Sequence, residues 1–201
     1  MTSDAMNTET AVLPLPDPAL SEAEQSESAP SLRWLPVPGS YRAEAGRCIL
    51  EISTSAGPLT TLRGRFAVLD NQLTVGEGDS LTALTVEAST ASLHTTRPLA
   101  GRRLLGGRGL NARNHRIVRF ESTAIDAAGR KSLSIPGQLY LRDEPVGICL
   151  KTRVVGREAD RLLILGVARL SYRALREACS FRLPWSVPAD HVRILLAADF
   201  R

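Results

Sequence analysis

Apolar and polar residues alternate along most of the chain from Tyr41 onward, which is the period of strands that bury one face. Three segments show this pattern clearly, and between their apolar positions lie residues such as Glu51, Glu87 and Arg119. We expect each of them to be a strand with one face in the core. Their apolar positions are Cys48, Leu50 and Ile52 in the first, Leu84, Val86 and Ala88 in the second, and Val118 and Phe120 in the third.

About eight such segments follow one another, and the last of them runs from Val192 to Phe200. Residues that favour turns separate the segments, including Asp70-Asn71 and Ala128-Gly129-Arg130. Short turns between consecutive strands make hairpins, so the pattern predicts an antiparallel meander. A meander of this length hides its edges best by closing into a barrel, and barrels of about eight strands can leave room for one ligand.

Residues 97–113 are the one long connection that does not fit a strand. Leu99, Arg102, Arg103 and Leu104 have the spacing of a short helix, which Gly106-Gly107 would end. The sequence therefore predicts an all-β fold, an antiparallel barrel of about eight strands with one long, partly helical connection.

The first 33 residues are rich in Ser, Glu, Ala and Pro and show no periodic apolar positions. Such a segment cannot bury enough surface to offset the entropy of ordering. We expect residues 1–33 to form a disordered acidic tail and residues 34–201 to form one barrel domain. Because no apolar run approaches the roughly 20 residues of a membrane-spanning helix, and the tail lacks the features of a secretory signal, we expect a cytoplasmic protein.

The charge of the chain is unevenly distributed. The formal net charge is +4, but residues 1–33 hold six of the 21 acidic residues and only one of the 25 basic ones. The remaining residues carry 24 basic and 15 acidic groups. This excess attracts anionic partners such as lipid headgroups, a membrane surface or nucleic acid.

Short motifs stand in order between Pro38 and the C-terminus. They are Pro38-Gly39-Ser40-Tyr41, Arg63-Gly64-Arg65-Phe66, Ala91-Ser92-Leu93-His94-Thr95, Val118-Arg119-Phe120-Glu121-Ser122, Pro136-Gly137-Gln138-Leu139-Tyr140-Leu141-Arg142 and Pro145-Val146. In order and spacing these motifs resemble the YceI-like family, lipocalin-like barrels whose members bind polyisoprenoid chains in a hydrophobic tunnel. The resemblance implies a lipocalin-like barrel and a long apolar ligand.

The chain departs from the family pattern in two places. The first strand of the family usually opens with Asp-x-x-His-Ser, whereas this chain has Glu44-Ala45-Gly46-Arg47-Cys48. The family's long connection usually supplies acidic residues and a Tyr-Pro, whereas the matching positions here are Gly109, Asn111, His115 and Arg116. The mouth of the barrel therefore differs in chemistry from the family pattern.

The apolar faces of the predicted strands are mainly aliphatic, because only 4% of the residues are aromatic. The resemblance implies that these faces line a cavity for an isoprenoid or acyl chain. The same side chains would also suit a solid core, which small barrels often have, and the residues alone leave both possibilities open. The predicted interior positions are Phe66, Val86, Phe120, Leu139, Leu141, Ile148 and Leu150.

Seven arginines and no acidic residue lie between Glu87 and Glu121. The planar guanidinium group donates two parallel hydrogen bonds to phosphate, so this cluster is a candidate site for an anionic headgroup. A solvated basic loop is the alternative. Nucleic acid is disfavoured as a partner, because no aromatic residue that could stack on bases lies between Phe66 and Phe120. The headgroup candidates are Arg97, Arg102, Arg103, Arg108 and Arg113.

Motifs for catalysis or metal binding are absent from the sequence. It contains no nucleophile elbow, phosphate-binding glycine loop or zinc helix. His94 and His115 have no cysteine or carboxylate near them in sequence, and the three cysteines lack the paired spacing of zinc or redox sites. We therefore expect no catalytic residues, no metal and no cofactor other than a bound polyisoprenoid or long-chain lipid.

These observations predict a non-enzymatic protein that sequesters or carries an isoprenoid or other long-chain amphiphile inside its barrel. The rival hypothesis is an adaptor with a filled barrel, whose basic face binds an anionic macromolecule or a membrane surface. Peripheral membrane contact fits either hypothesis. Homodimerisation is a further expectation, because residues 162–167 are apolar on both faces of the predicted strand.

Overall fold

The computed structural model describes residues 37–77, 81–158 and 161–201, so the predicted tail at residues 1–33 lies outside the described residues. The helices are α1 (Pro98–Leu105) and α2 (Tyr172–Cys179), with short 3-10 turns at Ala45–Arg47 and Thr90–Ser92. The strands are β1 (Gly39–Arg42), β2 (Cys48–Ala56), β3 (Leu59–Phe66), β4 (Val68–Val75), β5 (Leu81–Ser89), β6 (His94–Thr95), β7 (Ile117–Ser122), β8 (Asp126–Gly129), β9 (Ser132–Leu141), β10 (Glu144–Glu158), β11 (Arg161–Ser171) and β12 (His191–Phe200).

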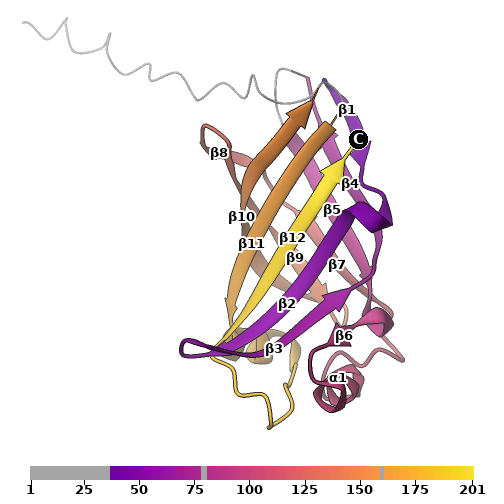
Figure 1. The fold of residues 1–201 in the computed structure, drawn as a ribbon, viewed down its shortest axis with the longest axis vertical. Coiled ribbons are helices and arrows are strands. Elements are labelled where there is room, and N and C mark those ends of the chain that lie inside the picture. The colour runs from indigo at the N-terminus through magenta and orange to yellow at the C-terminus, as the bar shows by residue number, and fades with distance from the viewer. Residues whose placement is uncertain (1–36, 78–80, 159–160) are drawn as a thin grey trace, which may run out of the picture.

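The strands of the described residues form one antiparallel sheet that curls into a barrel (Figure 1). From β4 to β12 each long strand pairs with the next long one, and β12 pairs back with β2. Only Ala67 separates β3 from β4, which pair with β2 and β5 respectively. This bent pair joins the two ends of the sheet, so the wall has eight strands when β3 and β4 count as one. The predicted all-β barrel is confirmed, and the short strands β1, β6 and β8 are additions to it.

The bend between β3 and β4 satisfies its own backbone groups. The carbonyl oxygen of Ala67 accepts a hydrogen bond from the N–H of Ser89 at 3.0 Å, and the N–H of Ala67 donates to the hydroxyl of Ser92 at 2.8 Å. Both peptide groups of Ala67 are therefore hydrogen-bonded at the bend. At the other end of the barrel, Arg42 and Arg201 exchange two backbone hydrogen bonds of 3.0 Å.

The inner faces of the strands make the core. Buried and half-buried residues alternate along all of β9, and buried residues recur at every second position through the middle of β10. The predicted turn at Asp70-Asn71 is wrong, because β4 runs through both residues. Asn71 is 2% exposed, and its side-chain amide accepts from the N–H of Ala43 at 2.6 Å and donates to the carbonyl of Ala43 at 3.0 Å.

Two connections close one end of the barrel, the lower end in Figure 1. One is the long connection of residues 97–113, called the arginine-rich connection below, in which α1 ends at Leu105 with Gly106 as its C-cap, as predicted. The other is residues 172–190, which contain α2 and are called the cap segment below. The N–H of Arg182 donates to the carbonyl of Arg108 at 2.9 Å, and the guanidinium of Arg97 donates to the carbonyl of Ser186 at 3.2 Å. Hydrogen bonds thus tie the two connections together over the end of the barrel.

None of the helices in the described residues is long and apolar enough to cross a membrane.

Candidate functional site

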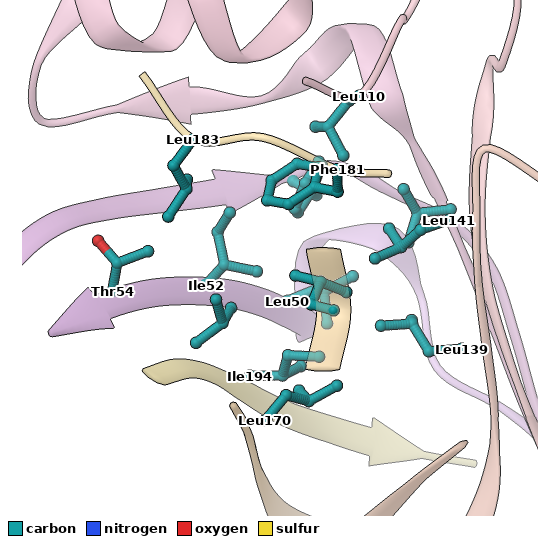
Figure 2. A pocket seen from close by; sticks show the side chains of 14 residues that line it. Leu50, Ile52, Thr54, Leu110, Leu139, Leu141, Leu170, Phe181, Leu183 and Ile194 are labelled. Carbon is teal, nitrogen blue, oxygen red and sulfur yellow. The ribbon is translucent and has the colours of Figure 1, made fainter. Parts of the chain in front are cut away.

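An apolar cavity of about 50 Å³ lies inside the barrel beneath the cap segment. Figure 2 shows Phe181 and Leu183 of the cap segment on one side of it and strand residues such as Ile194 on the other. Thr54 is the one polar residue among its described lining residues, and its hydroxyl shares a 2.7 Å hydrogen bond with that of Thr61. The lining therefore offers no unpaired polar group to a ligand.

A second cavity of about 20 Å³ continues the first one deeper into the barrel. The two share four lining residues, which are Leu50, Val118, Leu139 and Ile194. Both volumes are far below the roughly 300–1,000 Å³ of typical small-molecule sites. The interior is thus largely filled by side chains, and a chain-like ligand would enter only if aliphatic side chains moved apart.

All seven predicted interior residues are buried, none more than 9% exposed, and each lines at least one of the two cavities. They come from five different strands of the wall. The alternation of apolar and polar residues thus corresponds to the buried faces of these strands, while the role of the seven residues in ligand binding stays a prediction. Phe66, Leu139 and Leu141 line the larger cavity, and Val86, Phe120, Leu139, Ile148 and Leu150 line the smaller one.

The sequence interpretation missed the residues that close the larger cavity. Leu110 of the arginine-rich connection and Leu175, Phe181 and Leu183 of the cap segment all line it. Leu175 and Cys179 are the buried residues of α2, and their spacing of four is the helical signal that was available in the sequence. Phe181 and Leu183 lie in an irregular segment, where no periodicity marks the buried side.

The five predicted headgroup arginines are exposed at the capped end, and none of them lines a cavity. Arg97 contacts the cap segment through Ser186. Arg102 and Arg113 border a separate groove on the outside of the barrel. These arginines therefore lie on the surface around the capped end of the barrel, and their side chains do not reach its interior.

Cys48 and His115 are two titratable residues of the part of the chain that the structure describes. Burial raises the pKa of the Cys48 thiol to about 11, which keeps it protonated and poorly nucleophilic at neutral pH. His115 pairs with Asp143 at 2.7 Å, a carboxylate that is distant in sequence. Within the described residues no group of three or more His, Cys, Asp or Glu side chains is placed to hold a metal ion.

The fold has close counterparts among solved structures. The chain is similar to Burkholderia cenocepacia BcnA, with a TM-score of 0.65 and 16% identity over 79% of this chain and 99% of that one. A polyisoprenoid-binding domain from Saccharophagus degradans implicated in plant cell wall breakdown gives a TM-score of 0.55, 12% identity and coverages of 80% and 97%. A Campylobacter jejuni YCEI protein gives a TM-score of 0.58 and 13% identity, over 72% of this chain and 87% of that one. At these identities the likeness concerns the fold.

The sequence itself carries the family signal. No protein of curated function matches it significantly. The model of the YceI-like domain matches residues 43–193, which span the barrel wall from the residues before β2 into β12. The chain therefore belongs to the YceI-like family.

Proposed function

We propose that the barrel binds the chain of an isoprenoid or other long-chain amphiphile, for sequestration or carriage and without catalysis. The observation that carries the proposal is the pair of adjoining apolar cavities along the barrel axis, which have no unpaired polar lining group. Each CH₂ group transferred from water into such a site contributes roughly 0.8 kcal/mol. The polyisoprenoid-binding domain among the similar structures supports the same ligand class.

The capped end is the proposed entrance. Residues of the cap segment line the larger cavity at this end, and its Phe181 and Leu183 would have to move for a chain to enter. An anionic head would then remain outside, near the exposed arginines of the connection. Opposite charge favours this arrangement, because a guanidinium group binds a phosphate oxygen more strongly than a neutral donor does.

The same end suits peripheral contact with a membrane. Trp185 of the cap segment is 87% exposed and Leu99 of α1 is 74% exposed. Leu99 shares the outer face of α1 with Arg102 and Arg103, which follow it at the helical spacing of three and four. Exposed apolar side chains among basic ones are typical of surfaces that rest on anionic bilayers. Contact there would place the entrance next to the source of the ligand.

One observation favours the rival hypothesis of an adaptor. The two cavities measure only about 50 and 20 Å³, so the interior is close to a solid core. A filled barrel would leave the basic capped end, or the outer face of β11 where Leu165 is 37% exposed, as the functional surface. The outer face of β11 is also where a homodimer would form.

Lipid extraction from the full-length protein distinguishes these hypotheses. We expect protein purified from its native host to yield about one long-chain amphiphile per chain, measured by mass spectrometry. Leu139 lines both cavities, so Leu139→Phe should fill the interior and reduce the yield severalfold. Tyr140→Phe is the matched control, because the neighbouring residue lies on the outer face, where Arg119 stacks on its ring.

Recovery of only traces from the wild type, together with an experimental structure whose interior is filled, would favour the adaptor. Equal yields from all three proteins would place the amphiphile outside the barrel. The unfolding midpoint of Leu139→Phe shows whether this variant is folded, since overpacking typically costs about 1–3 kcal/mol.

A further inference from the structure

Three arginines stand in one row across the outer face of the barrel. Arg169 of β11 is directly opposite Arg193 of β12, Arg193 is opposite Ser53 of β2, and Ser53 is opposite Arg63 of β3. The arginines are exposed, because their strand neighbours, such as Ile194, point into the barrel. Arg169 and Arg193 thus form a like-charge pair on neighbouring strands.

This arrangement is unfavourable without a bound anion. Like charges directly opposite each other on adjacent strands destabilise a sheet. Within the described residues, Arg63, Arg169 and Arg193 form no ion pair. Glu51 precedes Ser53 by two residues on the same face of β2, but it stands opposite another arginine of β3. The row therefore carries an excess of uncompensated positive charge.

The row lines a surface groove of about 760 Å³. The groove is rich in hydrogen-bond donors, and Glu51 is the one carboxylate among its described lining residues. Asp190, close to the end of the groove, accepts a 2.8 Å hydrogen bond from the backbone N–H of residue 57. The lining residues are Glu51, Ser53, Ser55, Gly57, Pro58, Thr60, Arg63, Arg169, Ser171, His191 and Arg193.

We propose that this groove binds a small soluble anion with two or three linked phosphate groups. Neighbouring strands are about 4.8 Å apart, so Arg169 and Arg193 can hold one phosphate between them. Arg63 lies two strands beyond Arg193 and reaches the next phosphate, with Ser53 between them. Guanidinium groups bind phosphate through paired, charge-assisted hydrogen bonds, and the hydroxyl groups supply further donors.

The occupant is a free anion in preference to a bilayer. No large apolar side chain lines the groove, whereas insertion into a bilayer requires one. The groove lies on the outer face of β3, β2, β12 and β11, on the other side of the wall from the cavity, and shares no lining residue with it. The inference is thus independent of the lipid-binding function, and either could fail alone.

Isothermal titration of the full-length protein with pyrophosphate, tripolyphosphate and inorganic phosphate at constant ionic strength tests the site. We expect binding to strengthen from phosphate to tripolyphosphate. Arg193→Gln should weaken tripolyphosphate binding at least about tenfold, because Arg193 is central to the row. Arg130→Gln, which makes the same charge change in the turn between β8 and β9, should alter it less than about twofold.

A second measurement separates a binding site from a solvated surface. Without ligand, Arg193→Gln should raise the unfolding midpoint, since it removes the like-charge pair with Arg169. Arg65→Gln is the matched control, because Arg65 stands opposite Glu51 and its loss removes an attraction. Equal weakening by Arg193→Gln and Arg130→Gln, or no tripolyphosphate binding by the wild type at millimolar concentration, would overturn the proposal. Binding of vesicles with anionic lipids but not of tripolyphosphate would also overturn it.

Discussion

Gly137 lies on the inner face of β9, where the ring of Phe120 from β7 packs directly over it. A Cβ atom at this position would stand 2.6 Å from the Phe120 ring and 2.3 Å from the carbonyl oxygen of Glu121. We predict that Gly137→Ala lowers the free energy of unfolding by about 1–3 kcal/mol, as overpacking does. Denaturant unfolding measures the change.

Gly147→Ala is the control for this substitution. Gly147 is an exposed residue of the neighbouring strand β10, and a Cβ atom there would meet nothing within 4 Å. Its substitution should change stability by no more than about 0.5 kcal/mol. If both variants lose the same amount, the close approach of Phe120 does not determine the residue at position 137.

Asp199 near the end of β12 is a carboxylate that two arginines hold. The guanidinium of Arg161 donates two hydrogen bonds to it, at 2.6 and 2.8 Å, and Arg47 donates a third at 3.2 Å. These bonds, with that of Arg161 the largest cause, lower the pKa of Asp199 below its ordinary value of 3.8. A lowered pKa means that the carboxylate stabilises the fold above pH 3.8, and that this contribution is lost as the pH falls through the folded-state value.

We therefore predict that the difference in unfolding free energy between the wild type and Asp199→Asn is largest above about pH 5 and shrinks below about pH 4. Urea unfolding at a series of pH values measures it. Asp126→Asn serves as the comparison, because the exposed Asp126 forms no ion pair within the described residues. A pH-independent difference for Asp199→Asn would contradict the prediction.

Among the elements, the arginine-rich connection is the proposed binding site for the headgroup of the ligand, and substitutions in it test this role. Replacing Arg102, Arg103 and Arg108 with Ala should weaken binding of an anionic polyprenyl phosphate much more than that of the neutral polyprenol. Each lost charge-assisted hydrogen bond costs roughly 1.5–3 kcal/mol, whereas an apolar tail does not sense it. Competition against a fluorescent lipid measures both affinities.

The same triple variant should keep its unfolding midpoint, since exposed arginines contribute little to stability. Equal losses for both ligands would mean that the connection shapes the entrance without reading charge. Unchanged binding of both ligands would show that the arginine cluster is only a solvated surface.

For the whole molecule, the prediction concerns the acidic tail. Removing residues 1–33 should leave the free energy of unfolding within about 1 kcal/mol of the full chain, because the segment has no periodic apolar positions with which to dock. Denaturant unfolding of the two proteins compares them. A larger loss would show that the tail packs on the barrel.

Local sequence patterns were sufficient to predict which side chains of the barrel wall face inward. Alternation assigns each residue to a face without any knowledge of its neighbours in space, so Val86, Phe120 and Ile148 could be placed inside from the sequence. Gly106 marked the end of α1 for a similar reason, because a helix end depends on a few adjacent residues. These features follow from the geometry of a single strand or helix.

The preference of certain residues for turns gives a wrong prediction where a contact with a distant residue overrides it. Asp70-Asn71 has the composition of a turn, but hydrogen bonds to Ala43 hold the Asn71 side chain inside a continuous strand. The cap segment was not predicted to line the cavity, because Phe181 packs on the end of the barrel and no periodic pattern in the sequence marks it as buried.

Alternation along each strand was enough to predict inward-facing side chains, and turn residues were enough to predict a hairpin such as the one between β8 and β9, since both signals depend on neighbours along the chain. Closure of the barrel by β3 and β4, the small volume of the cavities, and the shared row of Arg63, Arg169 and Arg193 could be recognised only in the folded chain. These features depend on the register between strands. Pairing between β12 and β2 joins residues more than 130 positions apart, and no local pattern of apolar and polar residues fixes which of them stand opposite each other.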